Sequence, residues 1–275
     1  METGNKHEIK EVSHDLKLVF NVSKHCFKYA VFNIIKNCFE KIKSHQIDTN
    51  TDILNSEIEK IINIDPDLRK NYSKILGTLN NKFSTFIPEV LFDNKNINNY
   101  IDYTHGSIDE ECQYVKQKFT NCYEVFTIDS NLVSLLKTHF KNLELKSSSS
   151  VFVDYAINLN LKNTQNILIQ VNKNHFHIIL ISNGKFQFHN QFYFKNSNDF
   201  IYYLMNCLQT LGIKGNDIEL YVTSELEKTN TLFEILKKYV KVNFMDRPSI
   251  FLYQDNIMQT SPHKHHNLFS QLICE

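Results

Sequence analysis

The spacing of apolar positions between residues 166 and 211 predicts three strands followed by a helix. An apolar run at 167–171 leads into Asn172-Lys173-Asn174, which has the composition of a tight turn. The chain returns over 175–181, and Asn183-Gly184 separates this return from an alternating run over 185–194. Asn-Gly between two apolar runs favours a hairpin, because both residues tolerate positive φ.

From Asn198 the apolar period changes from that of a strand to that of a helix. One stripe of this helix collects Phe200, Ile201, Leu204, Cys207, Leu208 and Leu211. A meander that leads into a helix therefore opens the second half of the chain.

A comparable order begins the first half. Apolar runs at 16–20 and 26–32 flank a turn at 21–24, and residues 33–43 form either a third strand or the start of a helix. Two further helices are predicted at 57–62 and 68–79, the second of them beginning after Asp65-Pro66.

The remainder of the first half predicts a strand, a loop, a hairpin and a helix. Residues 82–87 read as a strand that ends at Pro88, and the Asn- and Asp-rich segment 93–109 reads as loop. Residues 111–119 and 122–128 alternate as a hairpin does, and Asp129 or Ser130 begins a helix that runs to Phe140.

The serine run at 147–150 is the clearest break in composition, so we expect two lobes, residues 1–146 and 147–275. After the opening meander, the second lobe continues with strands at 217–222 and 240–245, a helix at 226–239 and an amphipathic turn at 267–273 that docks on the body. Strands that alternate with helices after a meander predict a mixed α/β fold, with helices on the faces of a mixed sheet in each lobe.

Composition narrows the possible partners. Thirty basic and thirty acidic residues leave no net charge, so we expect no nucleic-acid binding. No apolar run approaches the length of a membrane span, and the polar first residues do not form a signal peptide. Six cysteines without C-x-x-C spacing favour reduced thiols in a cytoplasmic protein.

The second half resembles actin-like ATPases, particularly the members of pilus assembly and type II secretion. This resemblance implies two ribonuclease H-like lobes with a nucleotide between them. In those proteins the first turn of each lobe pairs an Asp, which organises magnesium, with glycines that let backbone N–H groups approach phosphate. A later Gly-Gly turn accommodates the adenosine.

The matching positions of this chain lack both the acids and the glycines. Asn21-Val22-Ser23 and Gln170-Val171-Asn172 stand at the two phosphate turns, and Ser224-Glu225 stands where Gly-Gly is expected. Asn172 can keep the turn shape, but amides do not supply the negative charge that magnesium prefers.

The whole chain is also similar to an uncharacterised bacterial family that has the actin-like ATPase fold and no assigned function. The similarity lies in Phe83-Ser84-Thr85-Phe86-Ile87-Pro88 with Leu91-Phe92, in the strand trio, and in the tail segments 261–263, 267–269 and 274–275.

Five histidines and one aspartate are candidates for catalytic or metal-binding residues. His263, His265 and His266 could hold zinc or nickel, but adjacent residues rarely ligate one ion and no partner ligands have matching spacing. His175 and His177 share one face of a strand, in the core or at a polar edge. Asp154 could approach the interlobe cleft, but the sequence assigns it no role.

We therefore expect a degenerate actin-like module, a pseudo-ATPase that binds or scaffolds another protein, and we assign no catalytic residue, metal or cofactor. Two alternatives stay open: nucleotide binding through non-standard residues, and sensing of a small ligand without turnover. The candidate residues of such a degenerate cleft are Asn21, Ser23, Lys24, Gln170, Asn172, Asn174 and Ser224.

Overall fold

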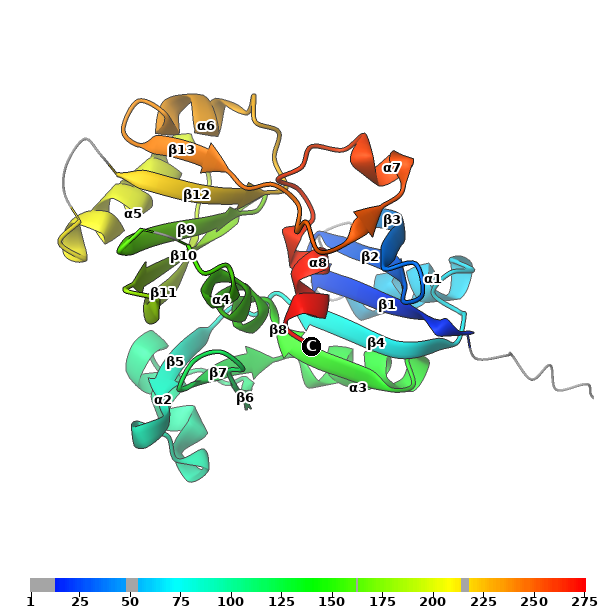
Figure 1. Ribbon diagram of the computed structural model, residues 1–275. Coiled ribbons are helices and arrows are strands. Elements are labelled where there is room, and N and C mark those ends of the chain that lie inside the picture. Colours follow the sequence, from blue (N-terminus) through cyan, green and yellow to red (C-terminus); the bar gives the residue numbers. More distant parts are fainter. Residues whose placement is uncertain (1–12, 48–53, 162, 214–217) are drawn as a thin grey trace, which may run out of the picture.

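Two mixed sheets form the body of the protein, and a smaller third sheet lies beside them (Figure 1). The computed structural model describes residues 13–47, 54–161, 163–213 and 218–275. The mixed α/β architecture expected from the sequence is confirmed.

The first sheet has the strand order β14-β3-β2-β1-β4-β8. Its strands are β1 (Ser13–Ser23), β2 (Cys26–Asn33), β3 (Cys38–Gln46), β4 (Tyr72–Leu79), β8 (Leu143–Ser147) and β14 (Leu252–Tyr253). β1, β2 and β3 form an antiparallel meander, whereas β4 is parallel to β1 and β8 is parallel to β4. Residues 33–43 thus contain a turn and the start of a third strand, one of the two predicted possibilities.

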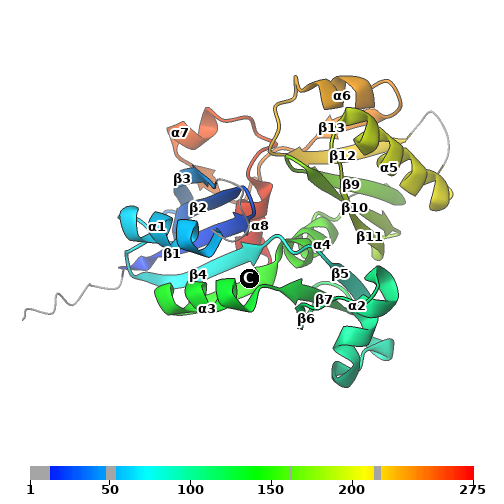
Figure 2. The ribbon, with the colours of Figure 1, turned by 180° about the vertical axis from the view of Figure 1, so that it is seen from behind.

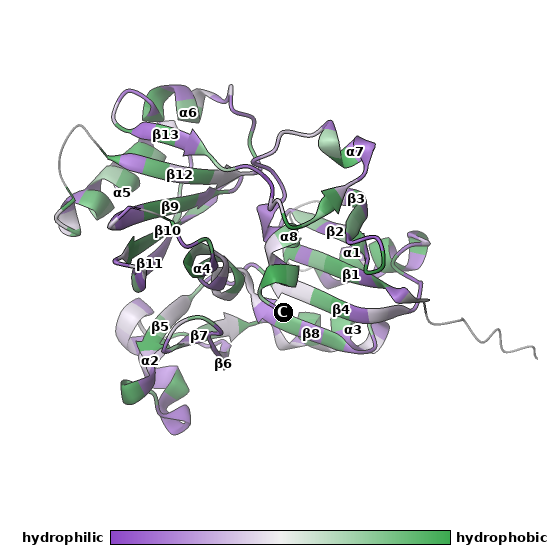
Figure 3. Ribbon diagram, viewed as in Figure 1, coloured by the Kyte–Doolittle hydropathy of each residue, from purple (hydrophilic) through white to green (hydrophobic). Residues whose placement is uncertain are grey.

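The second sheet repeats this plan in the order β11-β10-β9-β12-β13. Its strands are β9 (Gln165–Val171), β10 (His175–Ser182), β11 (Lys185–Tyr193), β12 (Glu219–Ser224) and β13 (Lys241–Phe244). The meander of β9, β10 and β11 is confirmed, and α5 (Ser197–Thr210) follows it as predicted. β9 and β10 are hydrophobic along most of their length, because helices cover both faces of this sheet (Figure 3).

Helices cover both faces of the first sheet (Figures 1 and 2). α1 (Leu54–Ile64) and α3 (Ser130–His139) pack on one face, and α7 (Asp255–Met258) and α8 (His266–Ile273) pack on the other. We call this sheet with its four helices the first lobe. The predicted division between residues 146 and 147 falls before the last residue of β8, while β14 and α8 return to the first sheet from the far end of the chain.

The second lobe consists of the second sheet with α5 and α6 (Thr231–Leu236) on one face. α4 (Ser148–Asn158) covers its other face and lies between the lobes (Figure 1). The third sheet has the order β5-β7-β6, formed by β5 (Ser84–Pro88), β6 (Glu111–Lys116) and β7 (Cys122–Ile128), and packs against α2 (Ile97–His105). Short 3₁₀ turns at Glu89–Leu91 and Asn94–Asn96 precede α2.

The predicted helix at 68–79 is wrong, because this segment contains β4. Tyr72, Ile75, Leu76 and Leu79 have helical spacing, but β4 is a parallel strand buried on both faces, where such a run is also expected. Gly77 has no room for a side chain. A Cβ there would lie 2.6 Å from Phe20 Cε2 and 2.8 Å from Leu145 Cδ2.

The serine run begins α4 and is not an exposed linker. Ser147 caps the helix by accepting the Ser150 backbone N–H at 2.9 Å, and all four serines are buried. Small side chains allow this first turn to lie close to the neighbouring strands.

Two other elements differ from their predicted form. The expected loop at 93–109 contains α2, whose buried Ile101 anchors it to the third sheet and which ends at Gly106 with φ of 84°. The helix expected at 226–239 is shortened to α6, because Asn230 caps it by accepting the Leu232 N–H at 3.0 Å. No helix in the described ranges is long and apolar enough to cross a membrane.

Candidate functional site

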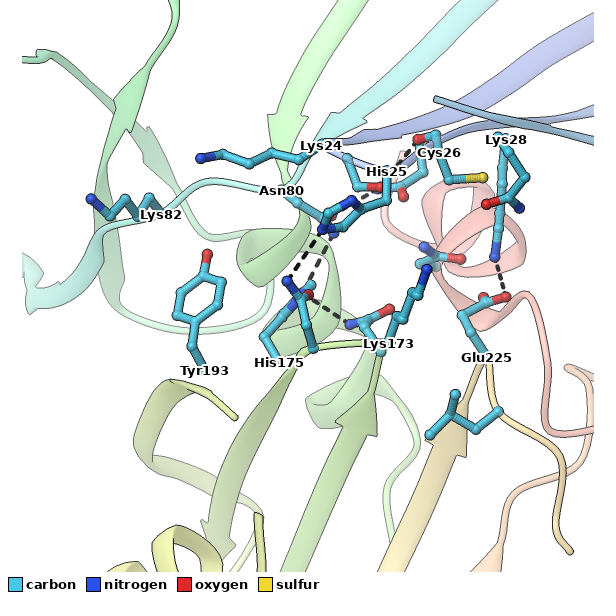
Figure 4. Close-up of a pocket in the computed structure, with 17 residues that line it drawn as sticks. Lys24, His25, Cys26, Lys28, Asn80, Lys82, Lys173, His175, Tyr193 and Glu225 are labelled. Atoms are coloured by element: carbon cyan, nitrogen blue, oxygen red, sulfur yellow. Dashed lines mark hydrogen bonds and ion pairs between the residues drawn. The ribbon is translucent and has the colours of Figure 1, made fainter. Parts of the chain in front are cut away.

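A cavity of about 370 Å³ lies between the two lobes, where the first turns of both meanders face each other (Figure 4). The β1–β2 turn and the segment after β4 contribute one wall, and the β9–β10 turn and the segment after β12 contribute the other. We call this cavity the cleft. Its lining residues are Asn21, Ser23, Lys24, His25, Cys26, Lys28, Gln46, Asn80, Lys82, Asn172, Lys173, Asn174, His175, Tyr193, Glu225, Leu226 and Asn267.

The structure brings five of the seven predicted cleft residues together: Asn21, Ser23, Lys24, Asn172 and Asn174. Gln170 and Ser224 lie outside the lining and are buried. Ser224 Oγ accepts the Leu226 N–H at 2.9 Å, so its hydroxyl supports the turn after β12.

The side-chain amide of Asn21 forms its hydrogen bonds within the protein. Its Nδ2 lies within hydrogen-bond distance of Thr78 Oγ1 (2.9 Å), Ser148 Oγ (3.0 Å) and Asn80 Oδ1 (3.1 Å). An amide can donate here where a carboxylate could not, so the network fixes the floor of the cleft between β1, β4 and α4.

His175 and His25 connect the two walls of the cleft. His175 Nε2 accepts from Asn172 Nδ2 at 3.1 Å and its Nδ1–H donates to Asn174 Oδ1 at 3.0 Å, which is the pattern of a neutral imidazole. Asn174 Nδ2 in turn reaches His25 Nε2 of the first lobe at 3.3 Å. Burial lowers the pKa of His175 to about 4 and also lowers that of His25, so both rings are neutral near pH 7.

The positive charge of the cleft therefore comes from lysines. Lys24, Lys82 and Lys173 reach it from three separate segments, and none has an acidic partner among the residues that the structure describes. Glu225 is the one carboxylate among the lining residues, and it forms an ion pair with Lys28. Lys24, Lys82 and Tyr193 gather at one end of the cleft, and the Lys28–Glu225 pair lies at the other (Figure 4).

Sequence reasoning missed Asn80, Lys82, Tyr193 and Glu225 as cleft residues. Asn80 and Lys82 were missed because residues 68–79 were predicted as a helix. In the structure β4 pairs in parallel with β1, and this pairing places the residues after β4 beside Asn21. Tyr193 is at the end of β11, between Phe192 and Phe194. This run of three aromatic residues was the available signal, because its members cannot all face the core of the sheet.

The residues of the cleft do not fit the magnesium ion that the fold implies. Magnesium is usually held by carboxylates and phosphate oxygens, and the lining offers amides at both phosphate turns. Its single carboxylate is already neutralised by Lys28. Within the described ranges no group of three or more His, Cys, Asp or Glu side chains could hold a metal ion.

The other candidate residues have structural roles. His263 shares a hydrogen bond of 2.8 Å with the Leu226 carbonyl, His265 Nδ1 lies 3.6 Å from the Glu225 carboxylate, and His266 is buried. His177 is buried too and lies 3.2 Å, Nδ1 to Nε2, from His189. Asp154 accepts the backbone N–H groups of Lys118 and Phe119 at 3.1 Å, which fixes the β6–β7 turn away from the cleft.

Solved structures share this architecture. A protein of Bacteroides thetaiotaomicron with an actin-like ATPase fold and unknown function matches with a TM-score of 0.80 at 21% identity, covering 96% of this chain and 97% of that one. A chain of the PilM–PilN type IV pilus biogenesis complex matches with a TM-score of 0.61 at 9% identity, covering 94% of this chain and 98% of that one. At these identities the matches show the fold, which is the actin-like ATPase fold predicted from the sequence.

The sequence matches one family of unknown function. The model of a family described as a protein of unknown function (DUF3822) matches residues 5–242. No curated protein matches the chain.

Proposed function

Because the chain belongs to DUF3822, a family of unknown function, we propose its role from the cleft: it binds a phosphate-bearing small molecule between its lobes without hydrolysing it. One observation carries this proposal. Three lysines without acidic partners in the described chain line one cavity, and the one carboxylate there is neutralised. Ammonium groups bind phosphate oxygens through strong, charge-assisted hydrogen bonds.

Donor groups of the cleft support the same ligand. Asn80 and Lys173 line the cleft beside His25, and their amide and ammonium groups can each donate a hydrogen bond to a ligand oxygen. Burial and the charges of Lys173 and Lys24 lower the pKa of His25, so the ring stays neutral between two cationic side chains that favour an anion.

The absence of turnover follows from the same residues. Phosphoryl transfer depends on positioning and on neutralisation of the transferred group, usually by a metal ion. The cleft supplies lysines for charge but neither the carboxylates for magnesium nor an unpaired carboxylate as a base. We therefore propose that the protein is a degenerate actin-like module that senses its ligand without turnover. The free state of all six cysteines supports a cytoplasmic location.

Calorimetric titration with inorganic pyrophosphate, in EDTA and then with magnesium, tests this proposal. We expect binding in EDTA. Lys24→Met, Lys82→Met and Lys173→Met should each weaken it about tenfold, since a hydrogen bond to a charged group contributes about 1.5–3 kcal/mol. The exposed Lys238→Met is the control and should bind as the parent protein does. No binding, or binding that requires magnesium, would overturn the proposal.

Protein binding is the second candidate, favoured by one surface. Beside the third sheet, Val90, Leu91 and Tyr103 are 91%, 67% and 93% exposed, and apolar residues that form one exposed patch favour a protein interaction site. The likeness to a chain of the PilM–PilN complex supports this role. Val90→Asp with Leu91→Asp should abolish recovery of a copurifying protein from the native host without lowering the melting temperature. Unchanged recovery would exclude this surface.

A further inference from the structure

A second cavity, of about 320 Å³, adjoins the cleft where the first lobe meets the third sheet. It lies where β1, β4 and β7 end and where α1 and α3 begin. We call it the side cavity. Much of its wall is apolar, formed by Val22, Leu54, Leu79, Ile128 and Leu132.

The two cavities share one wall, formed by Ser23, Lys24, Asn80 and Lys82. Lys24 and Lys82 are the lysines at the Tyr193 end of the cleft (Figure 4). A ligand whose phosphate lies between these ammonium groups is therefore adjacent to an apolar space.

The polar groups of the side cavity indicate which part of a ligand enters it. Glu110 and Asp129 contribute carboxylates, and Asp129 already accepts the Asn131 and Leu132 N–H groups at 3.0 Å. Two acids oppose a phosphate inside the side cavity, while the apolar wall favours a hydrocarbon there. The lysines of the shared wall thus hold the anion, and the apolar residues beyond them accommodate a hydrocarbon.

We propose that the ligand is a phosphate or diphosphate ester of a short apolar group, with its phosphate at Lys24 and Lys82 and its hydrocarbon in the side cavity. This inference rests on the proposed function of the cleft and names the chemical class of its ligand.

Titration of the full chain with geranyl diphosphate and with inorganic pyrophosphate, both in EDTA, tests the inference. The two probes share the diphosphate and differ in the hydrocarbon. Geranyl diphosphate should bind at least about tenfold more tightly, because each buried methylene group favours binding. Equal affinity would overturn the inference and leave the proposed function intact, whereas failure of both probes to bind would overturn the proposed function itself.

Variants on opposite walls of the side cavity locate the hydrocarbon. Leu132→Phe fills the space from α3, and Leu54→Gln places a neutral polar amide at the first residue of α1. Both should abolish the gain of geranyl diphosphate over pyrophosphate while leaving pyrophosphate affinity unchanged. Leu135→Phe, on α3 but outside the cavity lining, is the matched control and should keep the gain. A gain that survives both cavity variants would overturn the inference.

Sedimentation with vesicles of phosphatidic acid and phosphatidylcholine separates a soluble ester from a membrane lipid. We expect no sedimentation with the vesicles. Sedimentation that Lys24→Met abolishes would overturn the assignment to a short soluble group.

Discussion

The ammonium group of Lys28 and the carboxylate of Glu225 form an ion pair across the cleft. Lys28 belongs to β2 of the first lobe, and Glu225 follows β12 of the second lobe. Both side chains are largely buried, with exposed fractions of 16% and 18%. The pair therefore joins the lobes and removes one negative and one positive charge from the site where the ligand is proposed to bind.

Replacing Glu225 should strengthen anion binding while weakening the protein. Glu225→Gln removes the carboxylate and leaves the Lys28 ammonium free for a phosphate, so pyrophosphate affinity should rise several-fold. The same change leaves a buried charge without its partner, which costs about 1–3 kcal/mol of unfolding free energy. Calorimetric titration and chemical denaturation measure the two effects.

Replacing Lys28, the other member of the ion pair, should change pyrophosphate affinity in the opposite direction. Lys28→Met leaves the Glu225 carboxylate unpaired in the cleft, so it should weaken pyrophosphate binding, and the stability should again fall. Equal effects of Lys28→Met and Glu225→Gln on affinity would show that the pair is too far from the ligand to matter.

Gly77 should tolerate no larger residue. The Cβ of Gly77→Ala would overlap the Phe20 ring and Leu145, so we expect a loss of about 1–3 kcal/mol from overpacking. Phe20→Leu should partly rescue this variant by removing the ring atoms. If Gly77→Ala has the stability of the parent protein in urea denaturation, the close packing of β1 on β4 is wrong.

Glu124 should make the protein less stable as the pH rises. Burial raises the pKa of this carboxyl to about 8, while Ser147 donates to it. Because the pKa in the folded state exceeds the ordinary 4.5, the contribution is fully present below pH 4.5 and is lost as the pH rises toward 8.

Glu124→Gln mimics the protonated acid and should remove this loss. At about 1.4 kcal/mol per pKa unit, the gain over the parent protein should reach several kcal/mol at pH 8 and vanish near pH 4. Urea denaturation across this range measures the difference, and a gain that does not change with pH would contradict the assignment.

Asp154 should prove structural. Two carboxylate oxygens of Asp154 accept the Lys118 and Phe119 N–H groups, and Asp154→Asn keeps only one of these acceptors. The free energy of unfolding should therefore fall by about 1 kcal/mol, which lowers the melting temperature. Pyrophosphate affinity should not change, because the β6–β7 turn is outside the cleft lining. An altered affinity with normal stability would place Asp154 in the binding machinery.

Five of the six strands of the meanders were predictable because apolar or alternating runs are bounded by turn residues such as Asn183-Gly184, whereas β3, which is mostly polar, left a helix start as an equal possibility. β4 was not predictable, because a parallel strand buried on both faces has an apolar run that Tyr72, Ile75, Leu76 and Leu79 also space as a helix would. The burial that distinguishes the two comes from β1 and β8, which are distant in sequence.

The cleft was predictable to the extent that it is made of turns. Asn21, Ser23, Lys24, Asn172 and Asn174 stand at positions set by the local meander, and they do line the cavity. Lys82 and Glu225 join it through the pairing of distant strands, and the side cavity forms through contacts among three strands and two helices. No local pattern encodes those contacts.

The place of α8 also orders events during synthesis. This helix buries Leu268 and Phe269 against β1, β2 and β3, and Gln271 Nε2 donates to the Phe20 carbonyl at 3.0 Å across 251 positions of sequence. A ribosome therefore releases β1 to β4 long before the segment that covers one face of them exists. The second lobe, whose helices α5 and α6 arise close to their own strands, can complete its core earlier, although it is translated later than the first sheet.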